Sequence, residues 1–438
     1  MRQLNNAKRL SMQAELISIG DELLIGQVIN TNASFITTKL DEIGIPTRRI
    51  VTVGDSPEII QEQLAESLAK ADLIVTTGGL GPTNDDLTKK VIADFFGLGY
   101  DFNEEAYQRC KARFDLRGVK MPESNRSQAE VIAGSIVLQN TRGTAPGMIL
   151  KDPPNHPGKY IVIMPGVPYE MEEMVRVSVV PFLSPLSRQC IRHTTLMTAG
   201  IGESILAERI GNEREWIGEG STLAYLPHSA GVRLRVTTRG TECADVERRN
   251  HAAVQELTRL IGKFLYATTD MPLEEYVGNL LKTHGLKLGI AESCTGGLIS
   301  HRITNVPGSS DYFDEGFVTY SNHAKQASLN VREETIDRFG AVSEEVAIEM
   351  AKGCLEATGC DIAIATTGIA GPGGETATKP VGMVCIGLAT GGKLDRQTRA
   401  KTMTYSTDRI RNKERFSEAA LNLIRIALTE SEGQRKLE

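Results

Sequence analysis

Two glycine-rich turns carry the residues of this chain that are best suited to chemistry. Residues 76–86 read Thr-Thr-Gly-Gly-Leu-Gly-Pro-Thr-Asn-Asp-Asp, and residues 291–297 read Ala-Glu-Ser-Cys-Thr-Gly-Gly. Each turn follows a strand-like run and leads into a helix-like run. A glycine turn that opens a helix presents free backbone N–H groups and the positive end of the helix dipole, which suits a phosphate or another anion. The two turns together indicate two nucleotide-like sites.

Carboxylates accompany the first turn. Asp85 and Asp86 follow its glycines, and Asp21 follows the first strand-like run. One interpretation is helix capping, because an aspartate at a helix start accepts hydrogen bonds from unpaired N–H groups. The other is an acidic pair that holds a divalent cation against a phosphate, since hard cations prefer oxygen ligands. Three acidic loops follow predicted strands, at residues 20–22, 78–86 and 166–170. Loops at the carboxyl ends of parallel strands meet in one crevice, which favours the second interpretation.

Hydroxyl and amine groups cluster by motif in the last third of the chain. They are Ser293, Ser309, Ser310, Tyr320, Lys325 and Thr367. A lysine that loses its proton on desolvation can activate a serine, and a tyrosine can relay the proton. Backbone N–H groups of a glycine turn can hold the oxyanion, so such a set hydrolyses acyl bonds without a metal. The alternative is structural, because Ser and Thr are common helix caps and a lone lysine is usually solvated.

Composition excludes several classes of protein. The formal net charge of −6 argues against a general nucleic-acid binder, and no apolar run reaches the roughly 18 residues of a membrane span. The polar, basic start does not read as a secretory signal. Seven cysteines, scattered and odd in number, are typical of reduced thiols in the cytoplasm. No spacing of cysteine or histidine indicates a zinc site.

A length of 438 residues suggests about three domains. We expect a flexible extension over 1–12, an α/β domain over 13–183, a small α+β domain over 184–272 and a second α/β domain over 273–438. In the first domain, strands at 14–19, 47–53, 73–75 and 160–164 alternate with helices at 32–43, 57–71 and 85–96, which predicts a parallel sheet covered on both faces.

The other two domains have different patterns. The predicted order of elements in the middle domain is β-α-β-β-α-β. No motif in this domain suggests catalysis, so we expect a spacer or a dimerisation module. The last domain has predicted strands at 287–290, 362–366, 381–388 and 397–403. Its predicted helices lie at 273–284, 344–358 and 408–428.

The first domain resembles the molybdopterin-binding fold of molybdenum-cofactor biosynthesis proteins. The resemblance rests on Gly-Asp-Glu-Leu-Leu at 20–24, on residues 76–86 and on Met-Pro-Gly-Val-Pro at 164–168. It implies a three-layer αβα fold in which the glycine loop and its acidic residues bind a pterin phosphate or a nucleotide. The implied phosphate-binding residues are Gly78, Gly79, Gly81 and Thr83, and the implied ligands of a divalent metal are Asp21, Asp85 and Asp86.

The last domain resembles the CinA C-terminal family. The matching segments are 291–297, 308–310, 317–322, Lys325, 340–343 and 368–374. This family deamidates nicotinamide mononucleotide to nicotinate mononucleotide and ammonia, without a cofactor. The resemblance implies Ser310 as first choice of nucleophile, Lys325 as its base and Tyr320 as proton relay. Ser293 is the second choice of nucleophile; otherwise Ser293 and Thr367 position the amide. The implied substrate-binding residues are Gly296, Gly297, Ser309, Gly368, Gly371 and Arg409, with Arg409 on the phosphate.

The order of the domains from residue 14 to residue 428 is similar to that of the full-length CinA family. The resemblance implies a bifunctional pyridine-nucleotide salvage enzyme, a cytoplasmic and dimeric hydrolase. Its first domain would hydrolyse ADP-ribose to AMP and ribose 5-phosphate in a metal-dependent reaction. Two alternatives stay open. The first domain could bind a nucleotide or molybdopterin as a sensor without turnover, or the protein could act in competence by contact with another protein.

Overall fold

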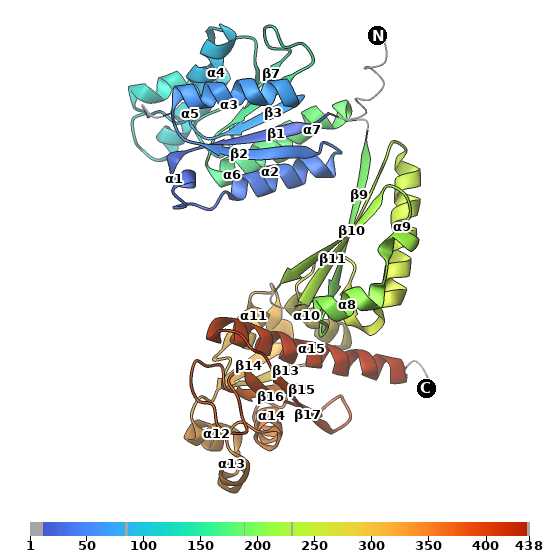
Figure 1. Cartoon of the computed structure of the whole chain (residues 1–438). Coiled ribbons are helices and arrows are strands. Elements are labelled where there is room, and N and C mark those ends of the chain that lie inside the picture. Colours follow the sequence, from blue (N-terminus) through green and yellow to red (C-terminus); the bar gives the residue numbers. More distant parts are fainter. Residues whose placement is uncertain (1–11, 84–85, 188, 229–230, 436–438) are drawn as a thin grey trace. The chain divides into compact units, whose positions relative to one another are not determined.

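The computed structural model describes residues 12–83, 86–187, 189–228 and 231–435 (Figure 1). The chain divides into two compact units, one comprising residues 1–193 with 238–249 and the other 194–237 with 250–438. Among the described residues, no helix is both long and apolar enough to cross a membrane.

The first domain is built on a sheet with the strand order β2-β1-β3-β8-β7-β6. The strands are β1 (Ala14–Ile19), β2 (Thr47–Val53), β3 (Leu73–Thr77), β6 (Ile136–Leu138), β7 (Gly147–Lys151) and β8 (Tyr160–Met164). The predicted parallel pairing is confirmed for β2, β1, β3 and β8. Strands β7 and β6, which the sequence did not predict, extend the sheet antiparallel. The carboxyl ends of β1, β3 and β8 therefore share one edge.

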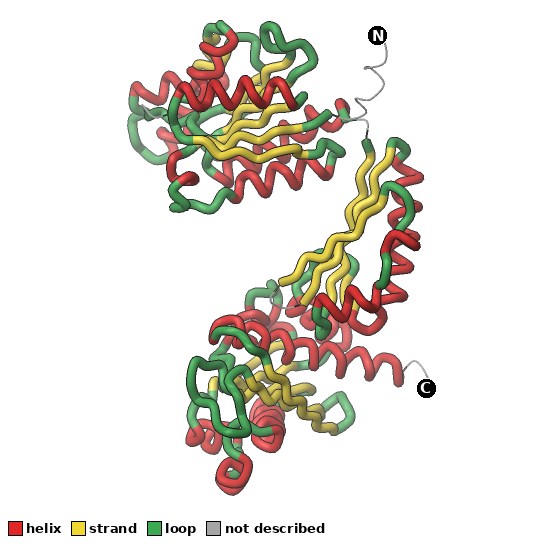
Figure 2. Tube along the Cα trace, in the orientation of Figure 1, coloured by secondary structure: helices red, strands yellow, loops and turns green. Residues whose placement is uncertain are grey.

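Helices cover both faces of this sheet, as Figure 2 shows. They are α1 (Asp21–Leu24), α2 (Thr31–Glu42), α3 (Pro57–Lys70), α4 (Thr88–Phe96), α5 (Glu104–Leu116), α6 (Pro168–Met174) and α7 (Val180–Leu183), with a π-helical turn at Val175–Val179. Strands β4 (Tyr100–Phe102) and β5 (Glu130–Ile132) pair separately. Buried Ile60 of α3 and Val91 of α4 belong to one core cluster, and buried Ile36 of α2 and Met171 of α6 to another. Two cores thus lie on opposite faces of one sheet, which is the predicted three-layer fold.

The middle domain confirms the predicted β-α-β-β-α-β order. Its elements are β9 (Cys190–Thr198), α8 (Glu203–Ile210), β10 (Ser221–His228), β11 (Gly231–Gly240), α9 (Cys243–Ile261) and β12 (Leu265–Ala267). The strand order in its sheet is β10-β11-β9-β12. Alternate residues of β11, such as Val232, Leu234 and Val236, are buried in a core that includes Leu206 and Leu257 from the two helices.

The cysteines correct one expectation. Cys190 at the start of β9 and Cys243 at the start of α9 form a disulfide, with their Cα atoms 5.2 Å apart. The sequence had suggested reduced thiols throughout, because cysteines distant in sequence give no sign of their spatial neighbours. The remaining cysteines are free and buried.

The last domain is a second α/β layer structure, with the strand order β14-β13-β15-β16-β17. Its elements are α10 (Leu273–His284), β13 (Leu288–Glu292), α11 (Leu298–Thr304), β14 (Phe313–Val318), α12 (Asn322–Leu329), α13 (Glu333–Phe339), α14 (Glu344–Thr358), β15 (Ile362–Gly368), β16 (Met383–Thr390), β17 (Gln397–Thr404) and α15 (Arg409–Arg435). Strands β14, β13 and β15 run parallel, and β16 and β17 pair antiparallel.

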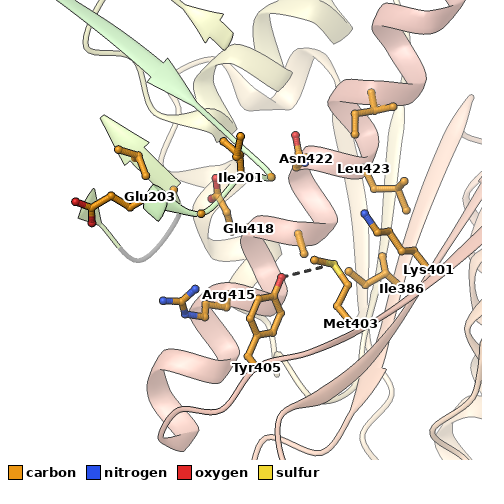
Figure 3. Close-up of a pocket in the computed structure, with 16 residues that line it drawn as sticks. Ile201, Glu203, Ile386, Lys401, Met403, Tyr405, Arg415, Glu418, Asn422 and Leu423 are labelled. Carbon is orange, nitrogen blue, oxygen red and sulfur yellow. Dashed lines mark hydrogen bonds between the residues drawn. The ribbon is translucent and has the colours of Figure 1, made fainter. Parts of the chain in front are cut away.

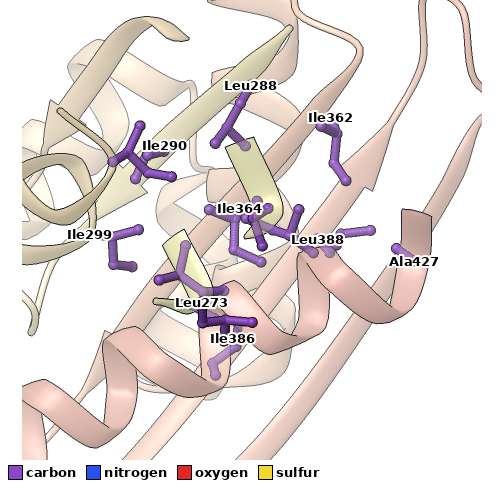
Figure 4. Close-up of a cluster of buried hydrophobic side chains, with 14 of the residues drawn as sticks. Leu273, Leu288, Ile290, Ile299, Ile362, Ile364, Ile386, Leu388 and Ala427 are labelled. Atoms are coloured by element: carbon purple, nitrogen blue, oxygen red, sulfur yellow. The ribbon is translucent and has the colours of Figure 1, made fainter. Parts of the chain in front are cut away.

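Alternating side chains divide the core of this domain into two layers. Leu288 and Ile290 of β13 point to the face covered by α10, α11 and α15, where they pack in a large buried cluster (Figure 4). Ala291, Ala363 and Ala365 point to the other face, where α14 packs. Large residues on one face and alanines on the other allow α14 to approach the sheet closely. This packing fixes the ends of β13 and β15, from which the functional groups project.

Candidate active sites

A serine and a lysine meet at the carboxyl end of β13. Ser293 directly follows that strand, and Lys325 lies in α12, whose start is capped by the Ser321 hydroxyl accepting from the Ala324 N–H at 3.0 Å. The Lys325 Nζ donates hydrogen bonds to the Ser293 Oγ at 3.0 Å and to the Thr319 carbonyl oxygen at 2.8 Å. Lys325 is only 2% exposed. The site therefore holds an amine against a hydroxyl in the interior of the domain.

Burial controls the charge of Lys325. It lowers the pKa of this amine, because the ammonium form loses its hydration. Within the described part of the chain, the Nζ bonds only to the Ser293 hydroxyl and to the carbonyl oxygens of Thr319 and Tyr320, and none of these is a carboxylate. Lys325 is therefore suited to serve as a neutral base toward Ser293.

Ser310, the first choice of nucleophile from the sequence, does not lie beside Ser293 and Lys325. With Ser309 it forms a 3₁₀ turn at Ser309–Asp311, just before β14. Strand β14 runs parallel to β13, and Glu292 at the end of β13 pairs with Val318 at the end of β14. Ser310 is therefore at the amino edge of the sheet, about 15 Å of strand length from Ser293. Ser309, predicted to bind substrate, lies in the same turn and is likewise distant from Ser293.

Tyr320 and Arg409 contact one another at the rim of the site. Tyr320 is 63% exposed, and its hydroxyl accepts a hydrogen bond from the Arg409 Nη2 at 3.1 Å. Arg409 also donates to the Gly371 carbonyl oxygen at 2.6 Å. This bond joins the start of α15 to the glycine-rich segment at residues 368–374. Only the main-chain carbonyl of Tyr320 is within hydrogen-bond distance of Lys325, so no hydrogen bond supports its hydroxyl as a proton relay.

The threonines at the end of β15 support the loops around Ser293. The Thr367 hydroxyl donates to the Ala341 carbonyl oxygen at 2.7 Å, so it anchors the loop before α14 and does not reach the serine. The Thr366 and Thr295 hydroxyls are 2.8 Å apart. Sequence reasoning named Thr367 and missed this buried pair, because the pairing depends on the parallel register of β13 and β15.

The second glycine turn has the conformation that its sequence predicts. Gly296 and Gly297 have φ values of 61° and 91°, in the left-handed region that favours glycine. The buried Glu292 carboxylate accepts hydrogen bonds from the N–H groups of Ile299 and Ser300 at 3.1 and 2.9 Å. The start of α11 is therefore capped by the protein itself. Gly368 is the last residue of β15. A Cβ at this position would lie 2.5 Å from the Met383 carbonyl oxygen, so the close pairing with β16 requires glycine.

A second cation reaches the glycine turn from α15. The Lys413 Nζ lies 3.5 Å from the position that a Cβ of Gly296 would occupy. Asp408 caps the start of α15 by accepting from the N–H groups of Ile410 and Arg411, each at 3.0 Å. An anion in this region would therefore be bound by side chains such as Lys413 rather than by free N–H groups of α15.

A pocket of about 530 Å³ lies at the carboxyl edge of the sheet in the first domain. Its walls come from the loops after β1, β3 and β8, as the sequence predicted, and Gly78, Gly79, Gly81 and Pro82 lie along it. The Gly78 N–H donates to the Met164 carbonyl oxygen at 3.1 Å, and a Cβ on Gly78 would lie 2.1 Å from the Ile19 carbonyl oxygen. Glycine is required here because the three loops touch.

Carboxylates surround this pocket, although several are already engaged. Asp21 and Asp55 accept hydrogen bonds from each other's backbone N–H groups, at 3.3 and 3.0 Å. The Asp86 carboxylate accepts from the Thr83 N–H at 2.9 Å, so Asp86 caps its own turn. Asp85 lies outside the described residues. No group of three or more acidic, histidine or cysteine side chains in the described ranges is arranged to hold a metal.

Two further residues of this pocket are Glu170, the acidic residue of the predicted loop at 166–170, and Asn32, which the sequence did not single out. Glu170 in the first turn of α6 is 8% exposed and accepts a hydrogen bond from the Asn140 Nδ2 at 2.7 Å. Asn32 donates to the Gly166 carbonyl oxygen at 2.7 Å, and its own Oδ1 has no partner within the described ranges. Asn140, which the sequence also did not single out, accepts a hydrogen bond from the Gly143 N–H at 2.6 Å.

Family models match three successive stretches of the chain. They are described as "Probable molybdopterin binding domain" over residues 15–185, "Damage-inducible protein CinA KH domain" over 193–267 and "CinA C-terminal domain" over 270–428. Fold, sites and matches define a class of proteins that joins a molybdopterin-binding-like domain to a CinA domain through a small KH domain.

Individual relatives identify the family. A CinA-like protein of Chloroherpeton thalassium is 67% identical over 420 residues, which cover 96% of this chain and 100% of the relative. A CinA-like protein of Chlorobaculum tepidum is 50% identical over 424 residues, with coverages of 96% and 100%. The chain belongs to the CinA family. A solved structure, the competence/damage inducible protein CihA from Agrobacterium tumefaciens, is 40% identical and covers 36% of this chain and 93% of its own, with a TM-score of 0.34.

Proposed function

We propose that the last domain hydrolyses the carboxamide of nicotinamide mononucleotide to nicotinate mononucleotide and ammonia. Ser293 is the nucleophile and Lys325 the general base. The observation that carries this proposal is the 3.0 Å hydrogen bond between the Lys325 Nζ and the Ser293 Oγ, made by a buried amine that no carboxylate holds in its charged form.

The first half of the reaction forms an acyl-enzyme. Neutral Lys325 accepts the proton of Ser293, and the Oγ attacks the carboxamide carbon. We assign the stabilisation of the oxyanion to backbone N–H groups of the turn that follows Ser293, such as that of Thr295. The Lys325 ammonium then protonates the leaving nitrogen, the C–N bond breaks, and ammonia departs.

The second half returns the enzyme to its starting state. A water molecule attacks the ester carbon while Lys325 takes one of its protons. The ester bond to Ser293 breaks, the proton returns to the Oγ, and nicotinate mononucleotide leaves as the carboxylate. Overall one water is consumed and one ammonia is released, and no cofactor takes part.

Substrate binding is proposed for the rim of the site. Arg409 and Lys413 supply positive charge for the phosphate, and guanidinium–phosphate pairs are strong and directional. The exposed ring of Tyr320 offers a face to the cationic pyridinium, an interaction of the cation–π type. This replaces the relay role first considered for Tyr320.

Hydroxylamine trapping tests the covalent step. The full-length protein is incubated with nicotinamide mononucleotide in the presence of hydroxylamine, and the products are separated. An acyl-enzyme predicts the hydroxamate of nicotinate mononucleotide, formed in proportion to hydroxylamine and at the expense of the acid. Turnover to the acid alone at every hydroxylamine concentration would contradict an acyl-enzyme that is open to external nucleophiles. A Ser293→Ala variant should form neither product.

We further propose that the first domain hydrolyses ADP-ribose to AMP and ribose 5-phosphate. The pocket at the loops after β1, β3 and β8 favours this reaction, because it combines glycine turns with the carboxylates of Glu22, Asp55, Asp86 and Glu170. The donor set fits a hard divalent cation that one or two carboxylates and the substrate's phosphates hold together. When bound, such a cation would neutralise phosphate charge. Glycine N–H groups would bind the diphosphate, and Glu170 would orient a water.

Measured AMP release tests this second activity. Turnover that requires a divalent salt and is lost in Glu170→Gln supports the proposal, with Glu130→Gln on the exposed edge of β5 as control. Saturable ADP-ribose binding without AMP release would favour the sensor interpretation instead. Activity of the purified chain alone would make a competence partner unnecessary for either reaction.

The remaining sequence predictions stay predictions. We propose a cytoplasmic homodimer that binds small nucleotides and no nucleic acid. Residues 193–267 contain no Gly-x-x-Gly segment, the loop with which KH domains clamp nucleic-acid backbones. This supports a structural rather than a nucleic-acid-binding task for the middle domain.

A further inference from the structure

A second pocket of about 440 Å³ lies within the second unit, between the turn after β9 and helix α15 (Figure 3). Its walls carry Ile201 from the turn, Glu203 from the start of α8, Met403 from β17 and Tyr405 from just after β17. Neither Ser293 nor Lys325, Arg409 or Lys413 lines it. The pocket is therefore separate from the proposed deamidase site, and its volume is typical of small-molecule sites.

The walls of this pocket are packed parts of one core. Met197 and Ala199 at the end of β9 are buried in the same cluster as Phe416 and Ala420 of α15. Gly200 has a φ of 74°, and a Cβ there would lie 2.5 Å from the Asn422 Nδ2. The turn of the middle domain thus rests directly on α15, and the pocket lies beside this close contact.

Glu418 lines the pocket and carries a buried acceptor without a partner. Glu418 is 6% exposed, and one of its carboxylate oxygens accepts a hydrogen bond from the Arg302 Nη2 at 2.8 Å. Its other oxygen, Oε1, has no hydrogen-bond partner anywhere in the described structure. A buried acceptor without a partner is destabilising, because it has lost its hydrogen bonds to water. A bound molecule with an N–H donor would satisfy it.

Positive charge lies at the mouth of the same pocket. The Arg415 guanidinium stands 5.6 Å from the centre of the Tyr405 ring, and Lys401 extends from β17 on the other side of that ring (Figure 3). Both cations are exposed, and the ion pairs found among the described residues do not include either. Ile201, Ile386 and Leu423 provide apolar surface in the same pocket.

We propose that this pocket is a second ligand site, which binds a purine or pyridine 5′-mononucleotide. An amino group on the base donates to Glu418, the flat ring packs against the apolar walls, and the phosphate binds Arg415 or Lys401. A planar amine-bearing base joined to an anion is the chemistry that this combination recognises. The site gives the middle domain a task, because its turn forms one wall.

Met403 provides a direct test. Full-length protein labelled with ¹³C at its methionine methyl groups is titrated with AMP, whose base carries an amino group, and the Met403 resonance is assigned with Met403→Leu. We expect AMP to shift the Met403 resonance saturably. Adenosine and nicotinamide, which lack the phosphate, should shift it much less at equal concentration. Shifts confined to other methionines would overturn the proposal.

Substitutions in the pocket separate this site from the two proposed active sites. Ala419→Leu adds bulk at the pocket wall and should abolish the Met403 shift. Arg415→Ala should weaken binding about tenfold or more, since it removes a charge-assisted hydrogen bond. Arg411→Ala, on the same helix but outside the pocket, is the matched control and should leave the affinity unchanged. An equal loss in Arg411→Ala, or unchanged binding in both pocket variants, would overturn the proposal.

Discussion

The Lys325 Nζ lies 3.0 Å from the Ser293 Oγ, across a sequence separation of 32 residues. The contact depends on two strand ends that share an edge. Ser293 follows β13, and Thr319, whose carbonyl also binds the lysine, follows β14. Parallel pairing brings both ends to the same place. A serine nucleophile and its base are thus positioned by sheet register rather than by a local motif.

Lys325 must be neutral to act as a base, so activity should rise with pH. Burial lowers its pKa. The pH at which kcat/KM rises should therefore lie below the usual pKa of lysine. Lys325→Met should reduce kcat by about 10²- to 10⁴-fold. Lys325→Arg should be as inactive, because a guanidinium does not lose its proton. A pH profile measured on nicotinamide mononucleotide tests both statements; a fully active arginine variant would contradict them.

Glu292 should support the site through the start of α11. Glu292→Ala leaves three buried or half-buried donors without an acceptor, those of the Ile299 N–H, the Ser300 N–H and the Ser300 hydroxyl. We expect a loss of roughly 2–4 kcal/mol in the free energy of unfolding, measured by urea denaturation. Glu315→Ala on exposed β14 is the control and should change stability by less than about 0.5 kcal/mol. Equal effects of the two changes would contradict a capping role.

The rim cations should affect substrate affinity more than chemistry. Arg409→Ala and Lys413→Ala remove phosphate partners that would act equally in the ground state and the transition state, so KM should rise about tenfold with a smaller change in kcat. Arg396→Ala, an exposed residue before β17, is the control. Steady-state kinetics measures the split. A fall in kcat at constant KM would place these side chains nearer to the reacting atoms.

Glu418 should make stability depend on pH. Burial raises its pKa to about 7, although the nearby Arg302 guanidinium opposes the rise. The folded protein therefore binds a proton more tightly than the unfolded chain, and this stabilisation is present at low pH and lost as the pH rises through about 7. Relative to Glu418→Gln, the wild type should lose on the order of 2 kcal/mol between about pH 5.5 and pH 8. If the free energy of unfolding changed equally with pH in both proteins, the raised pKa of Glu418 would be contradicted.

Gly78 should be intolerant of any side chain. Its φ is 108°, and a Cβ would lie 2.1 Å from the Ile19 carbonyl oxygen. Gly78→Ala should push the loops after β1 and β3 apart and abolish ADP-ribose binding, as measured by calorimetry. Gly99→Ala, where the structure leaves open space, should bind normally. Unchanged binding in Gly78→Ala would mean that the ligand does not use this loop.

The sequence predicted the elements well where periodicity was strong. Strand 14–19, helix 273–284 and the β-α-β-β-α-β order of the middle domain are confirmed within a few residues. The glycine turns were identified because their conformations demand glycine, as at Gly296 and Gly297. What the sequence could not supply is the spatial pairing of segments, which is why β6 and β7 were not predicted to extend the sheet.

The sequence could not show that Ser293, rather than Ser310, contacts Lys325, for the same physical reason. Both serines lie in glycine-containing turns, and both turns adjoin strands of the same sheet. They differ in which end of the strand they adjoin, before β14 or after β13, and β14 was not among the predicted strands. Without β14, the edge on which Ser310 lies could not be assigned. Contacts such as Thr295 with Thr366 depend on the same register.

Ammonia release from nicotinamide mononucleotide by Ser293→Ala and Ser310→Ala, measured beside the wild type, tests the central claim most directly. Each variant removes one hydroxyl from a turn, so the two are closely matched. We predict that Ser293→Ala loses at least about 10³-fold in kcat and that Ser310→Ala keeps the wild-type rate. Full activity in Ser293→Ala, or its loss only in Ser310→Ala, would contradict the assignment of Ser293 and Lys325 as nucleophile and base.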